Sequence, residues 1–239
     1  LFRDAGIAVM AAGDRQIVIK AGPFGEGSGG HSHSDVLSLV ARIGPREVLI
    51  DPGTYTYIAD PEERNHYRGS AAHNTLRIDG RDQALPAGPF RWLEKPATAI
   101  REWTSSGVAD SLDASCAYAG FTHRRQIRFL KSAGCVVVLD TVEGPAGEHI
   151  LEQFWHLGAA EDAGRLAFTA PAESLAGWRS RALGSREPAP VLRVTYQGPL
   201  PAQMAAVLDL SGNPAPGAVR LSGEAEKVVV AWNGRSVEF

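Results

Sequence analysis

Side chains that bind metals or move protons gather in the first third of the chain, between residues 22 and 82. His31 and His33 stand two positions apart, Asp51 ends an apolar stretch, and His73 precedes an asparagine. In an extended segment the first two histidines would point the same way, so both could reach one cleft. Two imidazoles and one carboxylate suit zinc, with water or another oxygen as the fourth ligand.

Each of these residues also has an ordinary structural explanation. A His-x-His pair is often a loop or sheet-edge feature, and the aspartate of Asp51-Pro52-Gly53 commonly caps its own backbone in a turn. If a metal is bound, Asp35 could orient one of the ligand histidines. The glycine-rich run 25–30 lacks the Lys-Ser/Thr of a phosphate loop, so a nucleotide site is not expected. Spacing alone therefore leaves a metal site and a polar loop both open.

One short helix is predicted within this region, near 61–68. Asp60 can cap its free N–H groups, Pro61 suits the first helical position, and Glu63 can complete a capping box. One face of the helix would carry Arg64, Tyr67 and Arg68.

Most of the remaining chain alternates apolar and polar residues with period two, which is typical of strands. Residues 131–134 and Asn233-Gly234 are hairpin signals. We therefore predict an all-β fold, a layered antiparallel β-sandwich forming a single domain over 1–239. The Pro/Gly/Ala-rich stretches 184–190 and 213–217 are expected to be loops or a boundary between sheets. The clearest strand predictions are 15–21, 37–43, 47–50, 97–104, 111–118, 123–129, 135–142, 150–156, 191–196 and 227–232.

Composition excludes several classes of function. The net charge is −3 and the basic residues are scattered, which argues against a nucleic-acid partner. No apolar run approaches the roughly 18 residues of a membrane span. The chain begins without an initiator Met or a signal peptide, which suggests a fragment of a longer polypeptide. Cys116 and Cys135 could form a disulfide or remain two buried thiols.

Three blocks in order resemble the bacterial heparinase II/III-like polysaccharide lyase family. They are GGHSHSDVLS at 29–38, LIDPGTY at 49–55 and YRGSAAHNTLRIDG at 67–80, and a weaker block, EHILEQFWHL, lies at 148–157. In that family an N-terminal α-helical toroid precedes a layered β-sandwich, and the cleft between them binds an acidic polysaccharide. This chain resembles the second part, so the toroid would be absent here and the isolated fragment inactive or nearly so.

The resemblance implies roles for individual residues. His33, Asp51 and His73 correspond to the ligands of one zinc ion per chain, and His31 matches a catalytic histidine that contacts substrate. Tyr67 is the best match for the catalytic tyrosine of the sandwich, although Tyr55 and Tyr57 compete for that place. The residues expected to bind substrate are Arg68, Tyr55 and His156, the last because it faces away from the core side of its strand.

The reaction implied is β-elimination in a polysaccharide that contains uronic acid. The uronate carboxylate is neutralised, a base removes the C5 proton, and an acid protonates the departing O4. Such a substrate implies a periplasmic or extracellular location. Two alternatives stay open: a non-catalytic carbohydrate-binding or structural module, and a zinc-dependent hydrolase with Asp35 as base.

Overall fold

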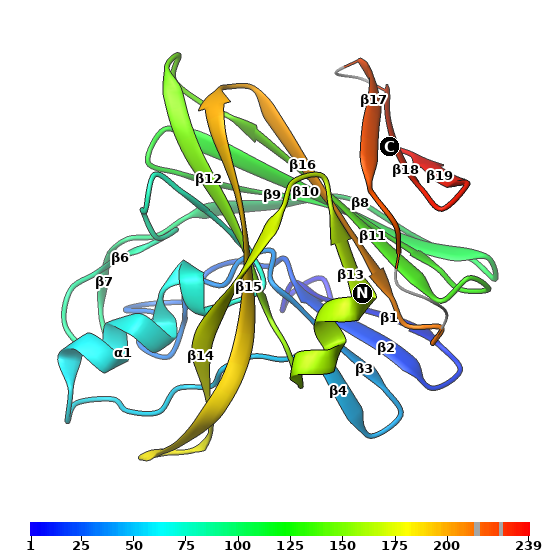
Figure 1. Cartoon of the computed structure of the whole chain (residues 1–239). Coiled ribbons are helices and arrows are strands. Elements are labelled where there is room, and N and C mark those ends of the chain that lie inside the picture. Colours follow the sequence, from blue (N-terminus) through cyan, green and yellow to red (C-terminus); the bar gives the residue numbers. More distant parts are fainter. Residues whose placement is uncertain (213–215, 225–226) are drawn as a thin grey trace.

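Antiparallel sheets form most of the structure (Figure 1), a computed structural model that describes residues 1–212, 216–224 and 227–239. One four-stranded sheet holds β1 (Ile7–Ala12), β2 (Arg15–Lys20), β3 (Leu39–Ile43) and β4 (Arg46–Leu49). The six-stranded sheet runs β13 (Leu166–Phe168), β16 (Ala202–Asp209), β11 (Cys135–Glu143), β10 (Phe121–Leu130), β9 (Ala109–Tyr118) and β8 (Ala97–Ser105).

A second four-stranded sheet has the order β14 (Ala172–Ala182), β15 (Ser185–Pro199), β12 (Glu148–His156) and β5 (Leu76–Ile78). Two small sheets complete the described part of the chain. They are β17 (Arg220–Glu224), β18 (Lys227–Trp232) and β19 (Arg235–Glu238), and the pair β6 (Leu85–Pro86) and β7 (Trp92–Glu94).

The predicted helix is present as α1 (Pro61–Arg68). The Asp60 carboxylate accepts hydrogen bonds from the N–H groups of Glu62 and Glu63, and Pro61 occupies the first helical position, which explains why the helix begins there. Two 3-10 turns, η1 (Ser70–Ala72) and η2 (Ala160–Arg165), are the other helical segments of the described residues. None of these helices is long and apolar enough to cross a membrane.

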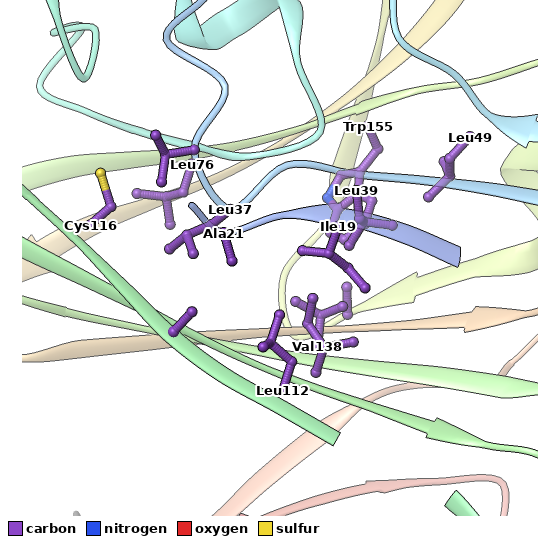
Figure 2. Packing of buried hydrophobic residues seen from close by; sticks show 14 of the residues in the cluster. Ile19, Ala21, Leu37, Leu39, Leu49, Leu76, Leu112, Cys116, Val138 and Trp155 are labelled. Atoms are coloured by element: carbon purple, nitrogen blue, oxygen red, sulfur yellow. The ribbon is translucent and has the colours of Figure 1, made fainter. Parts of the chain in front are cut away.

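The main core lies where the two four-stranded sheets face the six-stranded sheet. Figure 2 shows Ile19 of β2, Leu39 of β3, Leu112 of β9, Val138 of β11 and Trp155 of β12 packed together in this space. All five side chains are at most 2% exposed. The loops that carry the predicted site therefore rest on a rigid base.

A second core covers the opposite face of the six-stranded sheet. Val137 of β11 packs there with Val230 of β18, whereas Val136 and Val138 point into the main core. Because β11 is buried on both faces, its sequence is a nearly continuous apolar run instead of an alternation. Cys116 belongs to the main core and Cys135 to the second one, and both are free thiols.

The all-β prediction is confirmed, and each of the ten predicted strand segments overlaps an observed strand. The expectation of a loop over 184–190 is wrong, because Ser185–Pro199 is one long strand. Pro188 and Pro190 are tolerated there because the ladder between β15 and β12 ends at Val191, so no ladder bond requires their missing N–H groups. The Pro190 carbonyl still accepts from the N–H of Leu157 at 2.9 Å. Residues 213–215 of the other predicted loop lie outside the described residues.

Candidate functional site

The predicted metal ligands lie in connections that have little regular structure, whereas Tyr67 and Arg68 lie on α1 and His156 lies on β12. His33 lies in the long connection between β2 and β3, and Asp51 follows β4. His73 ends η1, just after α1. Three separate connections thus supply the three predicted ligands, and the strands on either side bring them together.

Asp51 and His73 are in direct contact. The Asp51 carboxylate lies 2.9 Å from Nδ1 of His73, and the N–H of Gly53 donates to the same carboxylate group at 2.8 Å. Desolvation favours the protonated acid, but the charge and hydrogen bond of His73 hold the pKa of Asp51 below its usual range. Nε2 of His73 is buried and has no hydrogen-bond partner among the described residues.

His33 stands against the same pair. Its ring centre is 5.2 Å from that of His73, and its Nε2 lies 3.3 Å from a guanidinium nitrogen of Arg64. Burial, followed by the charges of His73 and Arg64, lowers the pKa of His33 to about 3, so the imidazole is neutral at physiological pH. A neutral imidazole is the form that binds metals.

The three residues fit a zinc ion in the chemistry of their donor atoms. They offer two imidazoles and a carboxylate, which are groups that zinc binds, and the Asp51 carboxylate faces Nδ1 of His73 at 2.9 Å. In residues 1–212, 216–224 and 227–239 no group of three or more His, Cys, Asp or Glu side chains is arranged as a metal cluster. The predicted ligands lie close together, with Asp51 and His73 hydrogen-bonded to each other, but they are not arranged as a metal cluster.

His156 lies beside this group, on the side of β12 opposite the core residue Trp155. Its Nε2 is 3.0 Å from the carbonyl oxygen of Ala71, and its Nδ1 is buried without a partner. Burial is the main cause that lowers the pKa of His156 to about 4. Because His156 is 5% exposed, it packs behind the other site residues and contributes little to the protein surface.

His31 is exposed and sits among aromatic rings. Its ring centre lies 5.7 Å from that of Tyr57 and 5.9 Å from that of Phe90, and the Arg64 guanidinium covers Tyr57 at 5.0 Å. The accessible histidine of the site thus has Tyr57, and not Tyr67, as its neighbouring tyrosine.

Tyr67 lies on the buried face of α1, 5.4 Å between ring centres from Tyr55. Its hydroxyl is buried near the Arg186 guanidinium, and burial raises its pKa against the opposing effect of that charge. Arg186, from the far hairpin β14–β15, stacks on Tyr55 at 4.9 Å and on the half-exposed Trp178 at 4.6 Å. This hairpin supplies part of the site that the sequence blocks do not contain.

Arg68 is buried instead of facing solvent. Its guanidinium donates to the Asn65 side chain and to the carbonyls of Gly88 and Pro89, and it stacks on Trp92 at 4.5 Å. These contacts hold the connection before β7 against α1. The predicted role of Arg68 in binding substrate stays a prediction.

Asp35, which the sequence offered as a residue that could orient a histidine, forms its ion pair with Lys20. Asn74, Gln83 and Arg125 escaped the sequence analysis, and they hydrogen-bond to the backbone of the site segments. In β10 the inward positions alternate with outward ones, so the parity of the strand could have identified Arg125 as a buried charge.

An all-β fold that gathers histidine, tyrosine and carboxylate side chains in this way is consistent with a domain of a polysaccharide lyase. A family model described as Heparinase II/III-like, C-terminal matches residues 1–223, and the chain belongs to this family. A comparison with curated protein sequences gave no match.

Solved structures of heparinases have the same fold. A heparinase III gene product is 19% identical, with a TM-score of 0.79 over 100% of this chain and 42% of that chain. The heparan sulfate lyase HepC from Pedobacter heparinus is 18% identical, with a TM-score of 0.77 over 99% of this chain and 41% of that one. A structure of heparinase III is 17% identical, with a TM-score of 0.78, and covers 100% and 42%. The chain thus spans about two fifths of the length of these proteins.

Proposed function

We propose that this chain forms part of a lyase that cleaves a uronic-acid-containing polysaccharide by β-elimination, and that it contributes a zinc site and one wall of the substrate cleft. The observation that carries the proposal is that His33 and Asp51 both lie against His73, with the exposed His31 two residues before His33. Family membership supports it, because the chain belongs to a family of polysaccharide lyases. The rest of the machinery would come from an N-terminal helical domain outside this sequence, and the protein would act in the periplasm or outside the cell.

The zinc ion would be held by His33, Asp51 and His73, one ion per chain. When bound there, it would link the three connections that form this wall of the cleft. His33 and Asp51 are already in the protonation states that metal binding requires, a neutral imidazole and a carboxylate.

The elimination needs a base for the C5 proton and an acid for the leaving oxygen. The electron pair of the C5–H bond forms the C4–C5 double bond, the C4–O4 bond breaks, and O4 takes a proton. His31 is an exposed imidazole and suits proton transfer. Tyr67 stays protonated at neutral pH because burial raises its pKa, which suits an acid, but Tyr57 is the tyrosine next to His31.

Metal content is the first test. We expect about one zinc per purified wild-type chain, by analogy with single-ion structural sites, and loss of zinc in His33→Ala and His73→Ala. His149→Ala is the matched control, because His149 pairs with Asp79 elsewhere and should leave the zinc content unchanged. Wild type without zinc after careful preparation would refute the metal site.

Activity is tested on the full-length protein that contains this chain. We expect uronate oligosaccharides with an unsaturated end that absorbs ultraviolet light, and a strong loss of rate in His31→Ala. Tyr67→Phe and Tyr57→Phe compared side by side show which tyrosine matters. Saturated products would indicate hydrolysis instead, and binding without any cleavage would favour a non-catalytic carbohydrate-binding module.

A further inference from the structure

Asn74, the residue after His73, makes all of its side-chain hydrogen bonds to the backbone of other segments. Its amide nitrogen donates to the carbonyls of Leu39 at 2.7 Å and Ile50 at 2.9 Å. Its amide oxygen accepts from the N–H of His156. The side chain is 2% exposed, so one asparagine joins β3, the end of β4 and β12 in the interior.

These bonds fix the backbone on both sides of Asp51. Ile50, the residue before it, is held by Asn74 through its carbonyl and by the His156 carbonyl through its N–H at 3.0 Å. Asp51 itself accepts from the N–H of Gly53. Because Asn74 is bonded covalently to His73, its amide sets the position of His73 relative to Asp51.

Thr75, the residue after Asn74, holds the segment that follows His33 in the same way. The Thr75 hydroxyl donates to the Val36 carbonyl at 2.8 Å, and the Gln83 side chain bonds both the N–H and the carbonyl of Val36. Arg125 donates through one nitrogen to the carbonyls of Leu37 and Asn74, at 2.8 and 2.7 Å. The three predicted ligands are thus placed by one connected set of side-chain to backbone bonds.

Only an amide side chain can make all three hydrogen bonds found at position 74. Asparagine supplies two N–H donors and one acceptor, and each of the three finds a partner here. Aspartate would keep the acceptor but lose both donors and bring a charge into the interior, and alanine would lose all three bonds.

We propose that Asn74 is the positioning residue of the metal centre, and that Thr75 extends its action to the loop carrying His33. The inference rests on the proposed function, since it concerns the same His33, Asp51 and His73 ligands. In this proposal Asn74 and Thr75 do not bind the ion themselves, and their hydrogen bonds fix the positions of the residues that do.

The test measures zinc affinity and thermal stability together in the purified chain. Asn74→Ala is expected to lower zinc affinity by about 10-fold or more, as substitutions behind metal ligands do. Thr75→Val, which keeps the side-chain shape, should give a smaller loss of zinc affinity. This variant still tests the proposal if Asn74→Ala folds poorly. Val230→Ala in the second core is the matched control, because it lowers stability without touching the site.

Cobalt provides a readout that general destabilisation does not move. The visible spectrum of the Co²⁺-loaded chain reports ligand geometry, and we expect it to change in Asn74→Ala and Thr75→Val but not in Val230→Ala. Unchanged zinc affinity and an unchanged cobalt spectrum in a folded Asn74→Ala variant would overturn the inference while leaving the metal site intact. Wild type that binds neither metal would overturn the proposed function, and the inference with it.

Discussion

Replacing Arg125 with methionine should unfold this protein at a much lower temperature. Arg125 and Asp140 are each 1% exposed and form a two-pronged ion pair, with both N···O distances 2.7 Å. Burial alone would raise the pKa of Asp140, but Arg125, followed by His123, holds it well below its usual range. The carboxylate is therefore ionised inside the core because the guanidinium is there.

The size of the effect follows from what Arg125→Met leaves behind. Asp140 would keep only His123 at 2.7 Å and Gln153 at 2.6 Å, and the carbonyls of Leu37 and Asn74 would lose their donor. Removing one partner of a buried ion pair destabilises a protein by about 3–5 kcal/mol. At about 2–4 °C per kcal/mol for a chain of this length, the melting temperature should fall by about 10 °C.

Arg124→Met is the matched control for this prediction. Arg124 is the next residue along β10, points to the opposite face, and pairs with Asp113 at 2.9 and 2.6 Å with its side chain 38% exposed. An exposed pair contributes at most about 1 kcal/mol, so this variant should melt close to wild type. Thermal and urea unfolding of wild type and both variants at pH 7 test this prediction. Equal losses in the two variants would refute the reasoning that burial makes the Arg125 pair strong.

Two further predictions concern stability around the site. The pKa of His156 is lowered by burial to about 4, so between pH 6.5 and 4 the unfolded chain binds a proton that the folded chain does not. The free energy of unfolding should therefore fall as the pH decreases through this window, and His156 should account for about 2 kcal/mol of the loss at pH 5. The difference between the unfolding free energies at pH 7 and pH 5 should be smaller in His156→Gln than in wild type. Arg68→Met should lower stability by about 2 kcal/mol because the carbonyls of Gly88 and Pro89 lose a buried donor, and a variant of unchanged stability with weakened binding of uronate oligosaccharides would instead support a substrate role.

The fold could be predicted where one face of a strand is buried and the other meets solvent. In β10 every second residue is buried, and the alternation is visible in the sequence. β16 was not predicted, because both of its faces are covered and its alanine-rich run has no period of two. β14 also escaped, although it has eleven residues, because most of its side chains are exposed and it shows no regular alternation of apolar and polar residues.

Part of the candidate site could be predicted, because histidine and aspartate are residue types that bind metals. His33, Asp51 and His73 stand in recognisable blocks, and the structure brings them together. Arg186 could not be predicted, because it reaches Tyr55 only through the β14–β15 hairpin, more than a hundred positions away in the chain. Contacts of that kind depend on how sheets pack, which local patterns do not encode.

The irregular backbone of the site explains why so many polar side chains are buried there. The connections that carry His33 and Asp51 pair with few neighbouring strands, so side chains must satisfy part of their buried N–H and C=O groups. Asn74, Gln83 and Arg125 do this, and each bonds at least two backbone groups. Replacing any one of them therefore leaves several buried groups without partners, so these substitutions should be more destabilising than the loss of a single hydrogen bond.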